Sequence, residues 1–207
     1  MEVVPLDASH LPEFQSLYTE FFVELRGKQG WKPGYEESYK REAEEYSKRG
    51  DLILIALEEA KAVGFIRVSS REGYFKVEEI YVKPDFRGRG IGRMLVEKAE
   101  EVVKKHDDSV YLLVLPQDRD AIAFWKRLGY DVINTIELTK DLKSTGQTSF
   151  HTVEFLGEGF KIFRWKGERF TDEEKRFIEL LENFYEKGGT KKEFLKLVNS
   201  ALEGWME

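Results

Sequence analysis

The fold of this chain is decided by the stretch Arg87-Gly88-Arg89-Gly90-Ile91-Gly92. It lies between a segment with the character of a strand, Val77 to Lys83, and one with the character of a helix, Gly92 to His106. A glycine-rich turn in that place exposes several backbone N–H groups where the helix dipole is positive, and such a site suits a pyrophosphate. The sequence therefore predicts a ligand that carries a nucleotide.

Two common phosphate-binding loops do not fit these residues. A dinucleotide-binding fold would place the loop near the start of a βαβ unit, with an acidic residue closing the next strand. Here the loop follows a hairpin and a third strand, Tyr74 to Val82, and no acidic residue closes the strand Val110 to Leu115. A Walker loop needs Gly-Lys-Ser or Gly-Lys-Thr, and neither is present.

Composition narrows the function further. The 207 residues carry a net charge of -6 with acidic and basic residues interspersed, so nucleic acid is not an expected partner. The absence of cysteine excludes disulfides, thiolate metal sites and a cysteine nucleophile. The three histidines are far apart and form no ligand spacing, so no metal is predicted.

No apolar stretch approaches the roughly 20 residues of a membrane helix and no secretory signal is visible, so we expect a cytoplasmic protein with no membrane partner.

The periodicity of apolar residues predicts a mixed α+β fold. The N-terminal part alternates strands with helices, and after Leu142 a polar linker precedes a second hairpin and two amphipathic helices. We therefore expect a domain of residues 1–142 and an extension of residues 143–207. The extension is expected to dock on the first domain or on a partner. A homodimer is one such arrangement. The expected elements are strands at Glu2–Leu6, Leu52–Leu57, Ala62–Val68, Tyr74–Val82, Val110–Leu115 and Asp131–Leu138, helices at Leu11–Leu25, Tyr35–Lys48, Gly92–His106 and Asp118–Leu128, a break at Gly27–Gly34, a hairpin at Val153–Leu156 and Phe160–Trp165, and helices with capping boxes at Thr171–Glu174 and Thr190–Glu193.

Two linked blocks carry a family resemblance. The first is Ile80-x-Val82-x-Pro84-x-x-Arg87-Gly88-x-Gly90-Ile91-Gly92, and the second is Asp118-x-x-Ala121-Ile122-x-Phe124-Trp125-x-x-Leu128-Gly129-Tyr130. They resemble the Arg/Gln-x-x-Gly-x-Gly/Ala and Asn-x-x-Ala-x-x-Phe-Tyr-x-x-x-Gly-Phe blocks of the GNAT superfamily of acyl-CoA N-acyltransferases. The likeness covers roughly Glu2 to Leu142. It implies a central, mostly antiparallel twisted sheet flanked by helices, with acetyl-CoA as cosubstrate.

The resemblance implies a role for each matching residue. Backbone amides of the loop would cradle the CoA pyrophosphate, and the strand before it would pair with the pantetheine amides. A backbone N–H of Tyr81 or Val82 would hold the thioester carbonyl. Arg89 and Arg93 can also be interpreted as solvated charges at the start of a helix rather than ligands. The implied CoA-binding residues are Ile80, Tyr81, Val82, Arg87, Gly88, Arg89, Gly90, Ile91, Gly92, Arg93, Asp118, Ala121, Trp125 and Lys126.

The acceptor and the proton transfers are less defined by sequence. The family's acceptors are primary amines, in a small molecule or as a protein N-terminus or lysine, bound by the N-terminal helices; Trp31 is the candidate lining residue here. Strand alternation puts Glu78 and Glu79 on opposite faces, and we expect Glu79 to be the general base. Either carboxylate can equally be interpreted as a solvated charge at the strand edge. Trp125 stands where the family often has a Tyr that protonates the departing CoA thiolate, and an indole cannot do so. A sensor that binds acyl-CoA without turnover is therefore the alternative hypothesis.

Overall fold

The computed structural model of the chain describes residues 1–29, 34–71, 73–140 and 150–163. By its internal contacts the chain divides into two compact units, Met1–Lys166 and Gly167–Glu207. The second unit lies outside the described residues, and so do the two helices predicted in it. The boundary predicted at 142/143 and the candidate acceptor residue Trp31 also fall outside them.

Five strands in sequence order form the main sheet, which confirms the predicted α+β class. The first four are antiparallel neighbours, whereas β4 and β5 run parallel because a helix connects them. The strand predicted at Tyr74–Val82 is found with those bounds. The strands are β1 (Glu2–Pro5), β2 (Leu52–Glu58), β3 (Lys61–Arg71), β4 (Tyr74–Val82) and β5 (Val110–Leu112).

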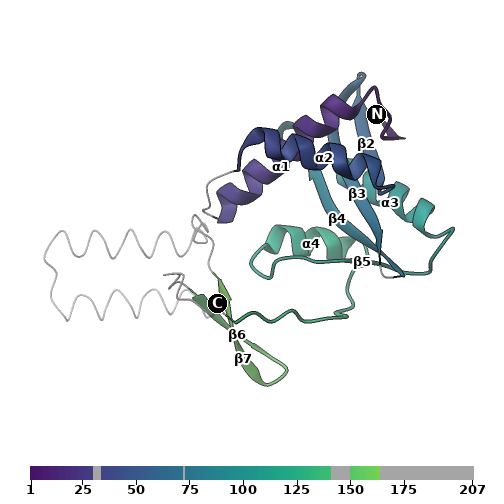
Figure 1. Ribbon diagram of the computed structural model, residues 1–207. Helices are drawn as coiled ribbons and strands as arrows, with labels where there is room; N and C mark the ends of the chain where they lie inside the picture. The colour runs from purple at the N-terminus through teal and green to yellow at the C-terminus, as the bar shows by residue number, and fades with distance from the viewer. Residues whose placement is uncertain (30–33, 72, 141–149, 164–207) are drawn as a thin grey trace, which may run out of the picture. The chain divides into compact units, whose positions relative to one another are not determined.

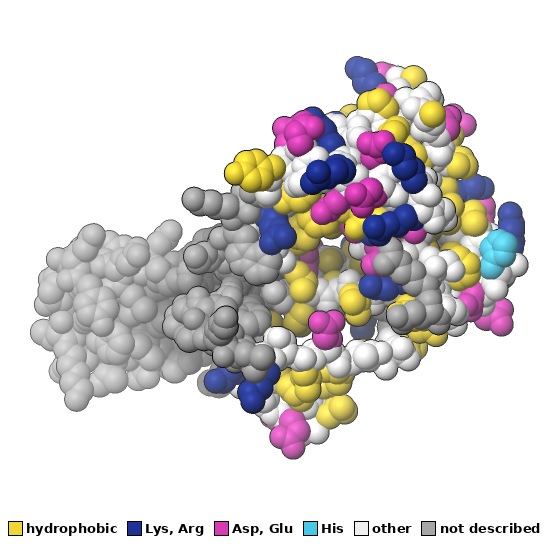
Figure 2. All heavy atoms as spheres, in the orientation of Figure 1, with side chains coloured by type: hydrophobic (Ala, Val, Ile, Leu, Met, Phe, Trp, Pro, Cys, Tyr) yellow, Lys and Arg dark blue, Asp and Glu magenta, His cyan; other side chains and the backbone are white. Residues whose placement is uncertain are grey.

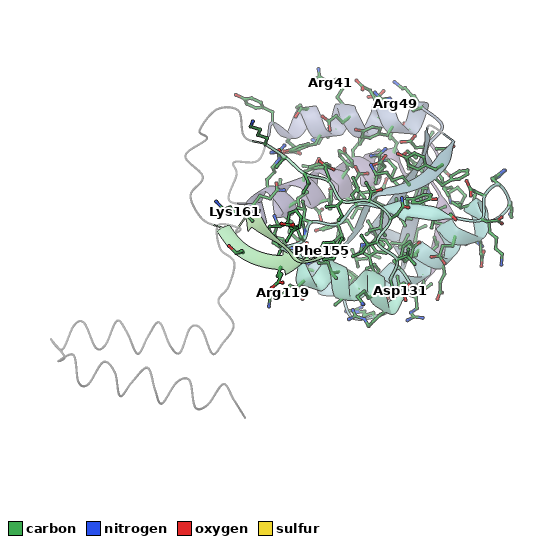
Figure 3. The ribbon with its side chains drawn as sticks, turned by 90° about the horizontal axis from the view of Figure 1, so that it is seen from below. Arg41, Arg49, Arg119, Asp131, Phe155 and Lys161 are labelled. Atoms are coloured by element: carbon green, nitrogen blue, oxygen red, sulfur yellow. The ribbon has the colours of Figure 1, made fainter. Side chains whose placement is uncertain are left out.

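Helices cover both faces of this sheet (Figure 1). One face packs against α1 (Leu11–Gln29) and α2 (Glu36–Lys48), and the other against α3 (Ile91–Val103) and α4 (Arg119–Arg127). Figure 3 shows this separation from below, with α2 on the far side of the sheet from α4. The break expected at Gly27–Gly34 begins later than predicted, since α1 continues through Gly27 to Gln29 and α2 begins at Glu36.

The outer surface of α1 and α2 carries both signs of charge. Acidic and basic side chains lie next to each other over these helices in Figure 2, and several form ion pairs one turn apart, such as Lys48–Glu44. Among the described residues, no helix is long and apolar enough to cross a membrane.

A second, two-stranded sheet confirms the predicted C-terminal hairpin. It consists of β6 (Phe150–Phe155) and β7 (Glu158–Phe163), paired antiparallel. Leu156 and Gly157 have φ of 54° and 80°, so both central turn residues are in the left-handed region. This is the backbone of a type I′ turn, the turn that matches the twist of a two-residue hairpin.

The strand predicted at Asp131–Leu138 is wrong. Residues 131–140 have no regular secondary structure, and apolar side chains such as Val132 and Ile133 are 87% and 67% exposed. A strand is stabilised by the ladder of a neighbouring strand, and within the described ranges none pairs with this segment. The predicted strand Val110–Leu115 is correspondingly shorter and ends at Leu112.

The turn between β2 and β3 gives a first prediction. Glu59 and Ala60 have φ of 51° and 62°, a conformation that costs an L-residue about 1 kcal/mol and glycine little. Ala60→Gly should therefore raise the free energy of unfolding by about 1 kcal/mol, measured by urea denaturation. The matched control is Ala123→Gly on the exposed side of α4, where the same change should cost about 1 kcal/mol. Equal signs for the two variants would contradict this account.

Candidate active site

The pairing of β4 with the last strand of the sheet, β5, ends partway along β4. They pair through three positions, ending at Val77 and Leu112, after which β4 continues alone on this side to Val82. The opening is therefore bordered by the backbone of residues 78–82, whose peptide groups have no β5 partner among the described residues. Such a free strand edge can hydrogen-bond an extended ligand.

A β-bulge lies where the two strands separate. Arg67 on β3 pairs with Glu79, but the next residue, Val68, pairs with Val77, so Glu78 is the extra residue of β4. The bulge interrupts the alternation of side chains along β4. The expectation that Glu78 and Glu79 point to opposite faces is therefore wrong.

Two β3 residues locate both carboxylates on the face of α1 and α2. Arg67 hydrogen-bonds Glu79 and Ser69 hydrogen-bonds Glu78, and Arg67 and Ser69 are two positions apart on one strand. Residues so spaced share a face. The face is that of α2, because the Arg67 guanidinium lies 3.8 Å from the ring centroid of Tyr46.

Glu79 is held by a buried arginine. Arg67 donates from Nε and Nη2 to the two oxygens of Glu79 at 2.6 and 2.7 Å, and from Nη1 to Asp51 at 2.5 Å. The Arg67 side chain is 4% exposed and that of Glu79 10%. Burial raises the pKa of Glu79, against the opposing effect of Arg67. Desolvation disfavours the Arg67 cation, but the two carboxylates outweigh it and raise its pKa. Arg67 therefore occupies both oxygens of Glu79.

Glu78 is the more accessible of the two carboxylates. It accepts a hydrogen bond from Ser69 Oγ at 2.6 Å and lies 3.0 Å from Lys76 Nζ, with its side chain 20% exposed. Burial opposes its ionisation, but the hydrogen bond from Ser69 and the Lys76 ammonium outweigh this and hold the pKa of Glu78 below its ordinary value. Glu78 is therefore ionised at neutral pH and stands next to the opening of the sheet.

The other residues of β4 divide between the two faces. Ile80 and Val82 pack into the core beneath α3, whereas Tyr81 is 6% exposed and packs beneath α1. The Tyr81 hydroxyl lies 3.5 Å from Glu20, and burial together with Glu20 and Glu24 raises the pKa of this phenol to about 12. The side chains of residues 80–82 therefore pack into the two cores, and only their backbone borders the opening. The resemblance implies that this backbone pairs with the pantetheine amides.

The glycine loop leads from β4 to α3 and leaves donors free. Gly88 and Gly90 have φ of 76° and 82°, and an added Cβ at either would meet nothing within 4 Å. The first bond within α3 runs from the Met94 N–H to the Gly90 carbonyl, and no side chain caps the helix. The N–H groups of Ile91, Gly92 and Arg93 thus have no carbonyl partner within the helix, the arrangement that binds phosphate.

Glycine is required at position 92 for packing rather than for backbone conformation. An added Cβ there would lie 3.1 and 3.2 Å from two ring carbons of Phe124 on α4. Glycine at this position therefore lets α4 pack against the first turn of α3.

The loop arginines make intramolecular contacts. Arg89 lies 3.3 Å from Glu58 and donates to the Asp85 carbonyl, and Arg93 lies 3.6 Å from Glu97. Both side chains are more than half exposed, which agrees with their interpretation as solvated charges. Arg87 turns back from the loop: its Nε donates to the Val82 carbonyl at 2.8 Å and its Nη2 to Glu24 at 2.6 Å.

The second block forms α4, and its first residue caps the helix. Asp118 is the N-cap residue, and its Oδ1 accepts from the Ala121 N–H at 3.1 Å. Lys126 is exposed in the last turn, where a cation is favourable to the helix dipole.

Trp125 is part of the hydrophobic core. It is 7% exposed, and its ring centroid lies 5.0 Å from those of Phe124 and Tyr130. The nearby Tyr130 hydroxyl donates to Glu100 on α3 at 2.8 Å, and burial together with Glu100 raises the pKa of Tyr130. Neither side chain provides a phenol with a pKa suited to protonating a thiolate.

Two aromatic residues of α1 and α2 pack in the core on their side of the sheet. Phe22 and Tyr39 stack at 5.2 Å beneath α1 and α2, and the Tyr39 hydroxyl accepts from the Gly34 N–H. Tyr35 is 89% exposed.

Sequence reasoning missed Arg67, Glu24 and Lys28 as members of this region. An arginine within the apolar run of Ala62 to Val68 was an available signal, because a buried cation needs a carboxylate partner. No group of three or more His, Cys, Asp or Glu side chains that could hold a metal occurs in the part of the chain that the structure describes.

Comparison with known proteins defines the class. The Acetyltransferase (GNAT) family model matches residues 11–130. An uncharacterised N-acetyltransferase of Methanocaldococcus jannaschii is 41% identical over 80 residues, 34% of this chain and 35% of that protein. One of Archaeoglobus fulgidus is 30% identical over 122 residues, covering 53% and 78%. The chain thus spans about a third of the length of the first of these relatives and most of the second.

Solved structures agree on the fold. The aminoglycoside N-acetyltransferase AAC(6')-Iy in complex with CoA has a TM-score of 0.56 at 16% identity, over 69% of this chain and 95% of that one. A PaiA N-acetyltransferase of Thermoplasma acidophilum in complex with coenzyme A has a TM-score of 0.52 at 19% identity, over 79% and 98%. Together with the glycine loop and the separated strands, these matches define a protein of the acyltransferase fold. The chain belongs to the GNAT acetyltransferase family.

Proposed function

We propose that this protein transfers an acetyl group from acetyl-CoA to a primary amine by direct attack within a ternary complex. The observation that carries the proposal is the separation of β4 from β5 just before Glu78, in a strand that leads directly into the glycine loop. A free strand edge and a set of free helix N–H groups lie in one continuous segment, residues 78–93. This is the donor set that an extended pantetheine arm and a pyrophosphate require.

The chain would hold the cosubstrate mainly through its backbone. The N–H groups of Ile91, Gly92 and Arg93 would bind the pyrophosphate, and the edge of β4 from Ile80 to Val82 would pair with the amides of the arm. Bound acetyl-CoA would supply the acetyl group as a reactive thioester. The N–H of Tyr81 or Val82 would polarise its carbonyl, since a backbone donor is fixed before reaction.

We assign the base to Glu78 rather than Glu79. Both oxygens of Glu79 accept from Arg67, which leaves it to position the bulge, whereas Glu78 is partly exposed at the opening. A carboxylate with a low pKa deprotonates a free ammonium poorly. The acceptor therefore loses its first proton to solvent and attacks as the neutral amine. Its nitrogen becomes far more acidic as its bond to carbon forms, so Glu78 can accept the second proton then, directly or through water. With Trp125 and Tyr130 engaged in the core, water is the source of the proton for the departing thiolate.

One relative suggests an acceptor to test first. A protein of Sus scrofa named thialysine N-epsilon-acetyltransferase is 34% identical over 86 residues, 41% of this chain and 44% of that protein. Thialysine carries a primary amine at the end of a flexible chain, and such an amine could reach the carboxylate at the bulge. Lysine and a peptide with a free N-terminus complete a panel that separates small-molecule from protein acceptors.

The test is CoA release measured with a thiol reagent. The chain contains no cysteine, so every thiol that appears comes from CoA. We expect release that depends on the amine, with a product heavier by one acetyl group in mass spectrometry. Tight CoA binding with no turnover on any amine would favour the sensor instead. Absence of CoA binding by calorimetry would overturn both.

A further inference from the structure

A stripe of charged residues on α1 contacts several parts of the acyl-CoA region. Glu20, Glu24 and Lys28 are four residues apart and so lie on one side of the helix. Glu20 lies 3.2 Å from Lys83 at the end of β4. Glu24 binds Arg87 of the loop, and Lys28 lies 3.9 Å from the N-cap residue Asp118 of α4. One helix thus contacts the strand, the loop and the second CoA block in turn.

Arg87 makes the central contact of this stripe. Its Nε donates to the Val82 carbonyl, its Nη2 donates to Glu24 at 2.6 Å, and its guanidinium lies 5.5 Å from the ring centroid of Tyr81. The guanidinium therefore binds the end of β4 and α1 together at the start of the loop. The pair is partly shielded, with side chains 44% and 29% exposed. A charge-assisted hydrogen bond of this length is among the stronger polar contacts.

We propose that Glu24 is a positioning residue for acyl-CoA binding, which rests on the function proposed above. Glu24 holds Arg87 in the bridging position, and Arg87 in turn holds the loop so that its N–H groups face the phosphates. Arg87 therefore serves the loop as a brace from α1, and its guanidinium does not bind phosphate. Because α1 belongs to the side of the sheet where the Glu78 carboxylate lies, the same brace fixes this helix relative to bound acyl-CoA.

Removal of the Glu24 carboxylate is expected to change CoA affinity in the direction opposite to that given by simple electrostatics. Removing a carboxylate near a highly anionic ligand should tighten binding, since it removes a repulsion. It would also release Arg87 to approach the phosphates. If Glu24 instead preorganises the loop, removal of Glu24 weakens CoA binding. Part of the binding free energy must then be used to order the loop.

The experiment compares Glu24→Gln with Glu97→Gln by calorimetry with CoA. Glu97 on α3 pairs with Arg93 of the same helix, so the control also removes one carboxylate that pairs with an arginine of this region but leaves the Arg87–Glu24 pair intact. We expect Glu24→Gln to raise the Kd for CoA about threefold to tenfold and Glu97→Gln to change it less than about twofold. Unchanged or tighter CoA binding by Glu24→Gln would overturn the proposal.

A double-mutant cycle locates the effect in the pair. Arg87→Gln and the double variant Arg87→Gln/Glu24→Gln should have the same Kd for CoA, because breaking the pair once removes the brace. If Arg87 binds phosphate directly, Arg87→Gln weakens binding much more than Glu24→Gln, and the proposal fails. Thermal unfolding of each variant separates loss of the brace from loss of the fold. If the wild-type chain does not bind CoA, the proposed function fails rather than the brace.

Discussion

Replacing Glu78 by glutamine is expected to lower kcat about 100-fold, the contribution of one general base. The amide keeps the size of the side chain and can still accept from Ser69, but it cannot take a proton from the acceptor nitrogen. Activity of the wild type should fall as pH drops through the pKa of Glu78, which lies below its ordinary value. Protonation of the amine lowers kcat/KM at acidic pH in both proteins, but the additional acidic limb that belongs to Glu78 should disappear in Glu78→Gln. Steady-state CoA release from pH 3 upward measures both.

Glu79→Gln is the matched comparison, because it makes the same change one residue along the chain. It breaks one of the two hydrogen bonds from Arg67 and should lower stability, but it should retain the acidic limb. The opposite pattern, with the limb lost in Glu79→Gln and kept in Glu78→Gln, would return the base to Glu79.

Replacing Arg67 by methionine should cost about 3–5 kcal/mol of folding free energy at neutral pH. Methionine fills much of the volume, but Asp51 and Glu79 are then buried without their cation, with Glu78 close by. The control Lys48→Met removes a cation that lies 2.6 Å from Glu44 in an exposed pair and should cost less than about 1 kcal/mol. Equilibrium denaturation in urea distinguishes the two.

The loss in Arg67→Met should also depend on pH. Arg67 opposes the effect of burial on Glu79, so its removal raises the folded-state pKa of Glu79 further above that of the unfolded chain. A group whose folded pKa is raised destabilises the fold above that pKa and ceases to do so as pH falls through it. The difference in unfolding free energy between wild type and variant should therefore shrink from pH 7 toward pH 4. A constant difference would show that lost packing, rather than buried charge, causes the effect.

The parts of the site predicted from sequence are those with local causes. The strand Tyr74–Val82, the glycine-rich turn after it and the helix that begins after Asp118 each follow from residues close together in the chain. The strand predicted at Asp131–Leu138 is wrong because a strand also depends on residues distant in the chain. Its alternating apolar residues are a local signal, but a strand also needs a neighbour, and the described sheet provides none.

The side-chain chemistry of the site depends on contacts between distant residues. Whether Glu78 and Glu79 share a face depends on a bulge, and a bulge exists only in the register between β3 and β4. Arg67 is twelve residues from Glu79 and sixteen from Asp51 along the chain, and Arg87 is 63 residues from Glu24. No pattern within one segment specifies such pairs.

The sequence by itself therefore determined the family, the class of fold and the position of the glycine loop, because glycine conformation and helix polarity are properties of short segments. The tertiary structure decided which carboxylate is free, that Trp125 packs in the core, and that Arg87 turns toward α1. These outcomes depend on which side chains meet across the sheet, since a charge or a ring takes its role from its partners.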